Sequence, residues 1–273
     1  MFNRILRLLC LSFTITTTIL AFVPDSVVSC VLPINVSGID GLSLLISRLI
    51  ICICLFALIS LFRFIGTKFR NKIVIKGDGY IIEVTYKNLF QVDNCKKVIN
   101  FDECFTTTVG ERPEDIKSSS VCGQYLSMSK LNEADIQRLS RSVGKQPRSK
   151  SLFQERDSYQ PGSILPNGDY LLMAFAKLSK NGRAEITRKE YIDCLNNLWD
   201  EIDMFHSDKN VAIPILGSNI TSFGELYLSQ QELLDIMIAT YKMSKSKLKK
   251  PCKLIICCKK ADDFSLNKIG TII

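Results

Sequence analysis

The stretch best suited to chemistry lies between an apolar run and an amphipathic run near the C-terminal end. The apolar run is Val211–Leu216 and the amphipathic run is Ser229–Tyr241. A loop between a strand and a helix favours anion binding, because the helix start offers unpaired N–H groups and the positive end of its dipole. The six residues expected to bind the anion are Gly217, Ser218, Asn219, Ile220, Thr221 and Ser222.

Two interpretations of this loop are open. Gly217 would allow the backbone to approach a ligand closely, and the N–H groups and hydroxyls of the loop suit phosphate oxygens. Alternatively, the loop is an ordinary strand-to-helix turn whose Ser and Asn side chains cap the helix.

The eleven cysteines do not show the spacings of a metal site. No CxxC pair is present, and His206 is the only histidine. An odd number of cysteines, some of them within apolar segments, fits free thiols in a reducing cytosol. The neighbours Cys257 and Cys258 lie in an apolar run and are interpreted as strand packing. We therefore expect no metal ion and no cofactor.

Alternating strand and helix patterns surround these residues. The stretch KIVIKGDGYIIEVTY, from Lys72 to Tyr86, predicts a hairpin around its Gly-Asp-Gly turn. Further strands are predicted at Lys97–Asn100, Tyr170–Leu178, Val211–Leu216 and Lys253–Cys258, and helices at Leu131–Leu139, Arg188–Phe205 and Ser229–Tyr241. The polar, basic stretch 140–160 is predicted as a mobile loop. The alternation indicates an α/β fold whose sheet is covered on both faces.

Residues 1–66 have a different composition. Two apolar stretches, about 5–23 and 42–62, are each long enough to cross a bilayer. Basic residues flank the pair while acidic residues lie between, so the positive-inside rule predicts a two-helix transmembrane hairpin with both termini cytoplasmic. The predicted domains are thus a hairpin at 1–66, in the cell inner membrane, and a cytoplasmic domain at 67–273.

Two points in this segment are open. The first apolar stretch has a basic start and could instead be a cleaved signal peptide. Arg48, in the second stretch, either extends its charge to the membrane surface or pairs with another helix or a pore.

Five blocks of the sequence resemble, in the same order, the macro domain of Thoeris anti-phage effectors. They are KKVINFDECFTTTVG, SSSVCGQYL, YLLMAFAKLSKNGRA, YIDCLNNLWDEI and IPILGSNITSFGEL. The resemblance runs from about Lys72 to the C-terminus, and two spans ahead of that domain resemble the membrane-anchored form of the effector. It implies a macro-domain-like mixed α/β sheet flanked by helices.

The resemblance also implies a function and partners. A TIR-domain partner would consume NAD during infection and release ADP-ribose or a derivative, such as an amino-acid conjugate. The macro domain would sense this nucleotide, and the membrane part would disrupt the lipid bilayer and kill or arrest the cell. We expect homo-oligomers on activation, because two helices per chain cannot enclose an aqueous path. No nucleic-acid partner is expected, since much of the net charge of +8 lies beside the membrane.

The resemblance assigns ligand-binding roles to individual residues. It places a diphosphate on the loop 217–222. Asn88 and Leu89 align with the acidic position that many macro domains direct at the adenine amino group. An Asn side chain can accept the same hydrogen bond through its carbonyl oxygen, although more weakly than a carboxylate.

Two further segments are implied by the resemblance. Asp102, Phe105 and Thr107 belong to the first pocket loop, which runs from Asn100 to Thr107, and Phe105 either stacks on the ligand or packs in the core. Gly123 and Gln124 belong to the block SSSVCGQYL, in which Val and Cys replace the family's Leu and His. The serines of that block are equally suited to capping a helix.

Three classes of function compete. An ADP-ribosyl hydrolase would need a general base or a polarising Asn, but the family's Asn-rich catalytic loop is not recognisable and His206 lies in the linker-like FHSDKN. A membrane-tethered scaffold would bind no nucleotide. A sensor that binds without catalysis explains both halves of the chain, and it is the function that we predict.

Overall fold

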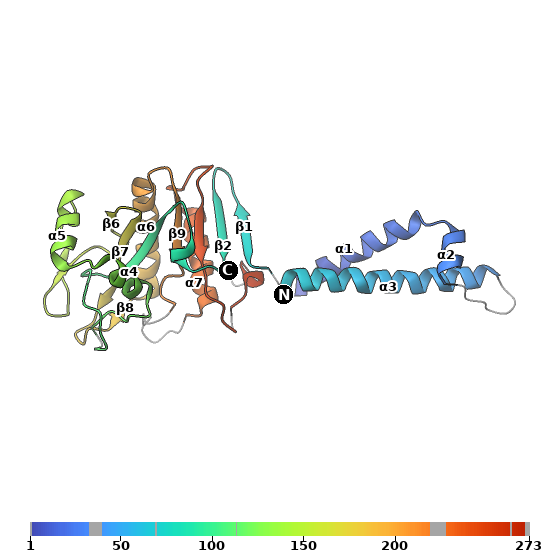
Figure 1. Ribbon diagram of the computed structural model, residues 1–273, viewed down its shortest axis with the longest axis horizontal. Coiled ribbons are helices and arrows are strands. Elements are labelled where there is room, and N and C mark those ends of the chain that lie inside the picture. Colours follow the sequence, from blue (N-terminus) through green and yellow to red (C-terminus); the bar gives the residue numbers. More distant parts are fainter. Residues whose placement is uncertain are drawn as a thin grey trace. The chain divides into compact units, whose positions relative to one another are not determined.

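The chain divides into two compact units, Met1–Arg70 and Asn71–Ile273. A computed structural model describes residues 2–32, 40–68, 70–112, 114–218, 228–262 and 264–270. The first unit is helical, whereas the second combines helices with a large sheet (Figure 1).

Three helices form the described part of the first unit: α1 (Phe2–Ala21), α2 (Asp25–Val31) and α3 (Asp40–Lys68). Within α3, the segment Leu42–Gly66 is long and apolar enough to cross a membrane, with a mean hydropathy of 2.7 and 6% of it buried. Helix α1 holds a shorter apolar stretch, Leu9–Ala21. By length and composition, the described residues therefore contain one candidate span, and the second span stays a prediction.

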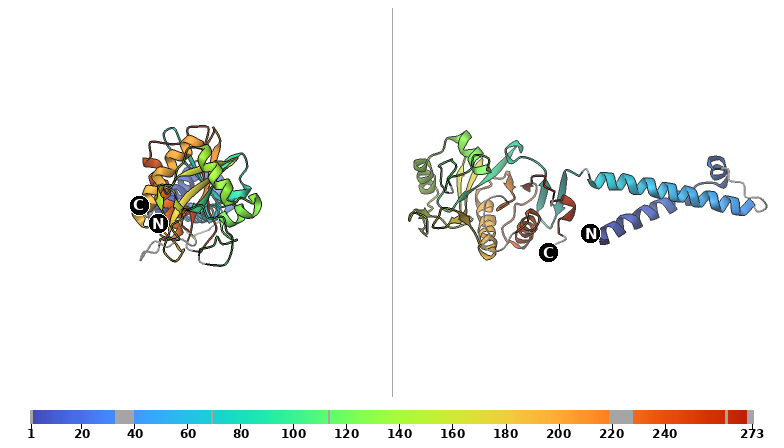
Figure 2. Two further views of the ribbon diagram at one scale, coloured as in Figure 1. Left: turned by 90° about the vertical axis from the view of Figure 1, so that its left-hand side faces the viewer. Right: turned by 90° about the horizontal axis from the view of Figure 1, so that it is seen from below.

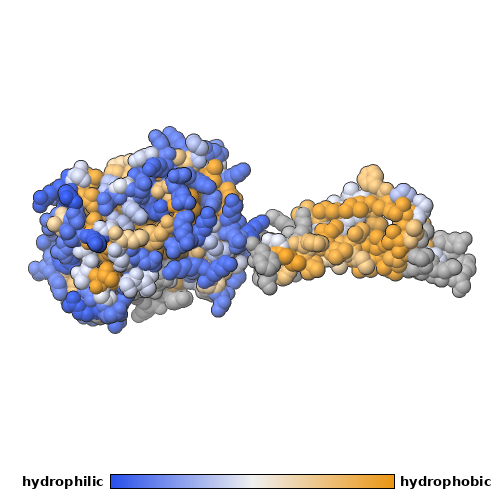
Figure 3. Space-filling view, viewed as in Figure 1, coloured by the Kyte–Doolittle hydropathy of each residue, from blue (hydrophilic) through white to orange (hydrophobic). Residues whose placement is uncertain are grey.

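The surface of the first unit is unusually apolar. Large apolar side chains such as Phe13, Leu45 and Phe62 are exposed. Hydrophobic residues cover much of the face of this unit that is drawn in Figure 3. Polar Ser12 and Thr16 are instead buried where α1 packs on α3. An exposed apolar surface of this extent is typical of contact with lipid or with another protein.

Arg48 of α3 has partners within the first unit. Its guanidinium forms an ion pair with Asp25 of α2 and donates to the carbonyl oxygen of Val23 at 3.3 Å. Of the two interpretations left open by the sequence, the structure therefore shows pairing with a neighbouring helix.

The second unit is built on one mixed sheet with the strand order β1-β2-β10-β9-β3-β7-β6, and β8 pairs with β7. The strands are β1 (Lys72–Lys76), β2 (Ile81–Thr85), β3 (Cys95–Asp102), β6 (Ile164–Asn167), β7 (Tyr170–Leu178), β8 (Ala184–Glu185), β9 (Asn210–Pro214) and β10 (Leu254–Cys257). The five central strands β2, β10, β9, β3 and β7 run parallel, while β1, β6 and β8 pair antiparallel. The carboxyl ends of the central strands therefore share one edge of the sheet.

Helices cover both faces of this sheet, as the sequence predicts (Figures 1 and 2). Successive residues of a strand point to opposite faces, so Val98 packs with α6 (Arg188–Phe205) and α7 (Gln230–Met243). Its neighbour Ile99 packs with α4 (Val121–Ser129) and α5 (Glu133–Ser142) on the other face. Helix α6 has the predicted bounds, whereas α5 and α7 begin and end within a few residues of them.

Strand β1 forms one edge of the sheet. Ile73 and Ile75 pack against the core, while Lys72, Val74 and Lys76 are exposed on the alternate positions. The hairpin with β2 that the sequence predicts is confirmed, with Lys72 opposite Thr85.

The segment 140–160 is more regular than the predicted mobile loop. It contains a short hairpin of β4 (Ser149–Lys150) and β5 (Asp157–Ser158). The buried carboxylate of Glu103 anchors this hairpin, because it accepts hydrogen bonds from the hydroxyls of Ser151 at 2.6 Å and Ser158 at 2.7 Å. The difference from the prediction arises because the anchoring group is far away in sequence.

Candidate functional site

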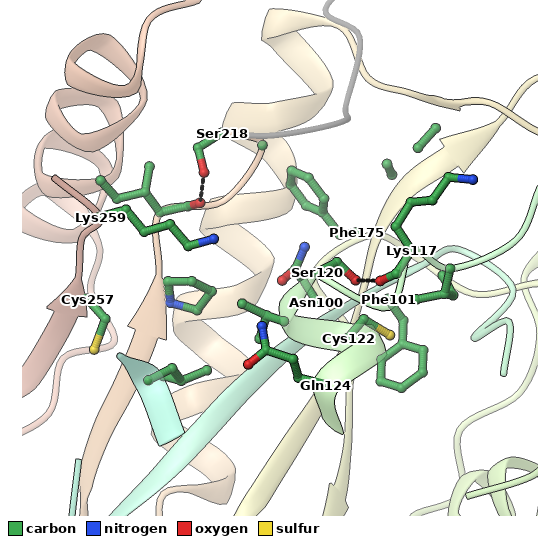
Figure 4. A pocket seen from close by; sticks show the side chains of 18 of the residues that line it. Asn100, Phe101, Lys117, Ser120, Cys122, Gln124, Phe175, Ser218, Cys257 and Lys259 are labelled. Atoms are coloured by element: carbon green, nitrogen blue, oxygen red, sulfur yellow. Dashed lines mark hydrogen bonds between the residues drawn. The ribbon is translucent and has the colours of Figure 1, made fainter. Parts of the chain in front are cut away.

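A cavity of about 980 Å³ opens at the edge of the sheet where the central strands end. Its lining comes from the ends of β2, β10, β9, β3 and β7 and from the residues that follow them. In α/β sheets, ligands bind outside the carboxyl ends of the strands. Figure 4 shows side chains from these separate elements converging on one space.

Three lysines, Lys87, Lys259 and Lys260, form what we call the basic wall of this cavity. Lys87 follows β2, whereas Lys259 and Lys260 follow β10, and these two strands are neighbours. None of the three forms an ion pair with a described residue. The ammonium of Lys260 lies 5.7 Å from the ring centroid of Tyr86. Unpaired cations in a concave surface create a potential that attracts anions.

Two helices begin at the same cavity. Gln230 and Val121, the first residues of α7 and α4, both line it. The hydroxyls of Ser229 and Ser120 cap these helices by accepting hydrogen bonds from backbone N–H groups. Because the positive end of each helix dipole faces the cavity, both helices add to the attraction of the basic wall for an anion.

The opposite side, which we call the mixed wall, carries both signs of charge: Glu111, Glu114, Asp115, Lys117 and Arg183. Lys117 donates to the carbonyl oxygen of Glu111 at 2.5 Å and lies 3.5 Å from its carboxylate. Asp115 accepts from the side chain of Arg112 at 3.2 Å. In Figure 4, Lys117 and Lys259 lie on opposite sides of the cavity.

Three thiols, of Cys122, Cys257 and Cys258, line the cavity. Burial raises the pKa of Cys257 to about 12 and raises the pKa values of Cys122 and Cys258 well above their usual range. Since the thiolate is the reactive form, burial disfavours reaction of these thiols at neutral pH. Among the described residues, no group of three or more His, Cys, Asp or Glu side chains could hold a metal ion.

The sequence itself shows which proteins share this arrangement. The family model described as "Thoeris protein ThsA, Macro domain" matches residues 82–259. The chain belongs to this family. The Thoeris protein ThsA of Bacillus amyloliquefaciens (strain Y2) is 33% identical over 232 residues, which cover 81% of this chain and 77% of that protein.

Solved macrodomains are more distant likenesses. One of Oceanobacillus iheyensis with ADP is 8% identical, with a TM-score of 0.45, covering 69% of this chain and 88% of that one. The macrodomain of Thermus aquaticus DarG is 14% identical, with a TM-score of 0.41, covering 67% of this chain and 100% of that one.

Several of the predicted site residues of the macro domain come together in the cavity. The lining includes Asn88, Leu89, Asp102, Gln124, Gly217 and Ser218. The remaining predicted loop residues, Asn219, Ile220, Thr221 and Ser222, lie outside the described residues. Gly217 has a φ of 79°, a left-handed conformation that suits glycine.

Two of the lining residues also have structural roles. The side-chain oxygen of Asn88 accepts from the N–H of Phe90 at 3.0 Å and so caps the short helix η1 (Leu89–Gln91). The carboxylate of Asp102 accepts from the N–H groups of Cys104 at 2.8 Å and Thr106 at 3.2 Å. Burial raises the pKa of Asp102 in spite of these hydrogen bonds.

Three predicted site residues do not line the cavity: Phe105, Thr107 and Gly123. Phe105 is 1% exposed, and its ring packs against Phe101 and Tyr159 at centroid distances of 5.6 and 5.2 Å. Gly123 is needed for packing, because a Cβ there would lie 2.2 Å from the carbonyl oxygen of Lys117. Of the two interpretations for Phe105, the structure therefore shows the core position.

The basic wall of the macro domain was not predicted. Lys259 and Lys260 directly follow the predicted strand Lys253–Cys258, and a pair of cations at the carboxyl end of a parallel strand was a usable signal. Asn100, at which the pocket loop implied by the resemblance begins, also lines the cavity, as does Gln230 of α7. Gln230 was not predicted, because no local pattern distinguishes it from other surface amides.

Proposed function

We propose that this chain is a membrane-anchored sensor that binds ADP-ribose or a derivative in Thoeris anti-phage defence. The observation that supports the ligand is the cavity, which is lined by the starts of two helices and by three lysines that form no ion pair with a described residue. A diphosphate carries two negative charges and needs donors of this kind. The cavity volume of about 980 Å³ leaves room for the rest of such a nucleotide or for an amino-acid conjugate.

The proposed sensor binds its ligand without turning it over. Burial holds the three thiols that line the cavity, Cys122, Cys257 and Cys258, in the neutral form. His206 lies at the C-terminal end of α6 and is not part of the lining. An ADP-ribosyl hydrolase is the competing function, and product analysis after prolonged incubation with ADP-ribose distinguishes the two.

The proposed output is disruption of the inner membrane by assembled copies of the first unit. Helix α3 supplies a segment that suits a span, and α1, with 20 residues, would extend about 30 Å at 1.5 Å per residue. A TIR-domain protein would supply the nucleotide from NAD.

Both termini of the proposed hairpin would be cytoplasmic. A reporter that is active only in the cytosol should therefore be active when it is fused to either end, and an inactive reporter at one end would contradict the hairpin.

Titration calorimetry of the full chain with ADP-ribose tests the ligand. We expect binding by the parent and none by Gly217→Glu, because the new carboxylate would occupy the cavity beside the proposed diphosphate position. Ser207, at the opposite edge of the sheet, provides a control as Ser207→Glu. A Gly217→Glu protein that is folded and binds as well as the parent would show that the loop is not the binding element.

A further inference from the structure

Tyr86 connects the cavity to the start of β1. It lines the cavity after β2, and its N–H donates to the carbonyl oxygen of Asn71 at 3.0 Å. The hydroxyl of Thr85 donates to the same carbonyl at 3.3 Å. In the sequence, three residues, 69–71, lie between α3 and β1. A chain extends at most about 3.3–3.6 Å per residue, so three residues give a short connection.

The side chain of Tyr86 is held by the segment that follows β10. The ammonium of Lys260 lies 5.7 Å from its ring centroid, and the ring of Phe264 packs edge-on at 5.9 Å and 84°. The hydroxyl oxygen of Tyr86 accepts from the N–H of Leu266 at 3.3 Å. The position of the Tyr86 ring therefore depends on the position of the chain after β10.

Lys260 has two competing partners when an anion enters the cavity. It belongs to the basic wall, and in the absence of ligand its ammonium lies over the Tyr86 ring. A charge-assisted hydrogen bond to a phosphate oxygen is stronger than an exposed cation–π contact. A bound diphosphate therefore draws the ammonium of Lys260 from the ring and removes one of the contacts that hold Tyr86.

We propose that Tyr86 is a positioning residue that carries ligand binding from the cavity to Asn71 and so to the chain leading to α3. Coupling requires an element whose contacts differ between the free and the bound state. The Lys260–Tyr86 contact is this element, and the hydrogen bond from Tyr86 to Asn71 transmits the change. The proposal rests on the proposed function, because it requires an anionic nucleotide in this cavity.

The other end of the same hairpin provides a matched control. The ammonium of Lys247 lies 5.6 Å from the ring centroid of Tyr80, which packs edge-on against Tyr241 at 5.8 Å and 86°. Tyr80 precedes β2 and does not line the cavity. Both tyrosines thus have a lysine ammonium near the ring and an edge-on aromatic neighbour, but only Tyr86 lines the cavity.

Hydrogen exchange of the full chain in detergent, with and without saturating ADP-ribose, tests the coupling. The variants are Tyr86→Leu, Tyr80→Leu and Lys260→Met, and calorimetry sets the saturating concentration for each. In the parent and in Tyr80→Leu, ligand should speed exchange of β1 about fivefold, which corresponds to the roughly 1 kcal/mol of one cation–π contact. In Tyr86→Leu and Lys260→Met, the exchange of β1 should not respond to ligand.

Each outcome bears on a different statement. A full response in a folded, saturated Tyr86→Leu or Lys260→Met protein would overturn the coupling. Binding by the parent without any change in β1 would also overturn it, while leaving the proposed function intact. Failure of the parent to bind ADP-ribose would overturn the proposed function and the coupling together.

Discussion

Removing the two lysines that follow β10 should weaken nucleotide binding. Lys259 and Lys260 are exposed and form no ion pair with a described residue, so their loss leaves no buried charge unpaired. A hydrogen bond to a charged group contributes about 1.5–3 kcal/mol, and solvent exposure reduces this to about 1 kcal/mol for each lysine. We therefore expect Lys259→Ala with Lys260→Ala to cost about 2 kcal/mol, which is about thirtyfold in Kd.

The control pair is Lys249 and Lys250, which precede β10 at the opposite edge of the sheet and do not line the cavity. Their replacement by Ala changes the net charge by the same amount. The Kd for ADP-ribose, measured by calorimetry at low and high salt, should depend less on salt in the variant that lacks Lys259 and Lys260. The variant that lacks Lys249 and Lys250 should keep the salt dependence of the parent, because salt screens the attraction between the basic wall and the ligand. Equal Kd values for the two double variants would refute the assignment of the basic wall.

Three further outcomes are expected. Burial raises the pKa of Asp102 from its ordinary 3.8, so the folded state loses stability as pH rises through the raised value. The Asp102→Asn variant should therefore have a higher Tm than the parent at pH 8, and the difference in Tm should disappear at pH 3. Arg48→Ala removes the ion pair between α3 and Asp25 of α2 and should speed hydrogen exchange in α2, whereas Arg48→Lys should restore part of the protection. Phe105→Leu should lower the free energy of unfolding by about 1 kcal/mol with an unchanged Kd, because the ring packs in the core; a tenfold weaker Kd would instead support ligand stacking.

The sequence was most informative where a pattern is local. The period of Arg188–Phe205 predicts α6 with its observed bounds, and the capping box of Thr187 and Glu190 explains its start. The β1–β2 hairpin follows from two β-rich runs around a glycine turn. Gly217 and Ser218 were predicted at the cavity because a strand, a loop and a helix follow one another there.

The rest of the site depends on contacts between distant segments. The basic wall forms only because β10 lies beside β2, and strand order cannot be read from the periodicity of either strand. Phe105 lies beyond the end of β3, after a turn, and has a φ of 53°. Side chains alternate between the two faces only within a strand, so the alternation along β3 does not predict the direction of Phe105.

The two lysines of β1 have a consequence for how copies of this chain meet. An edge strand presents unpaired N–H and C=O groups that can pair with the same strand of another molecule, and lysines are a common protection against such pairing. In β1, the apolar run between Lys72 and Lys76 is bracketed by charge on its exposed side. When the β1 strands of two copies meet edge to edge, these like charges would repel. The lysines therefore disfavour pairing between the sheets of two copies through β1.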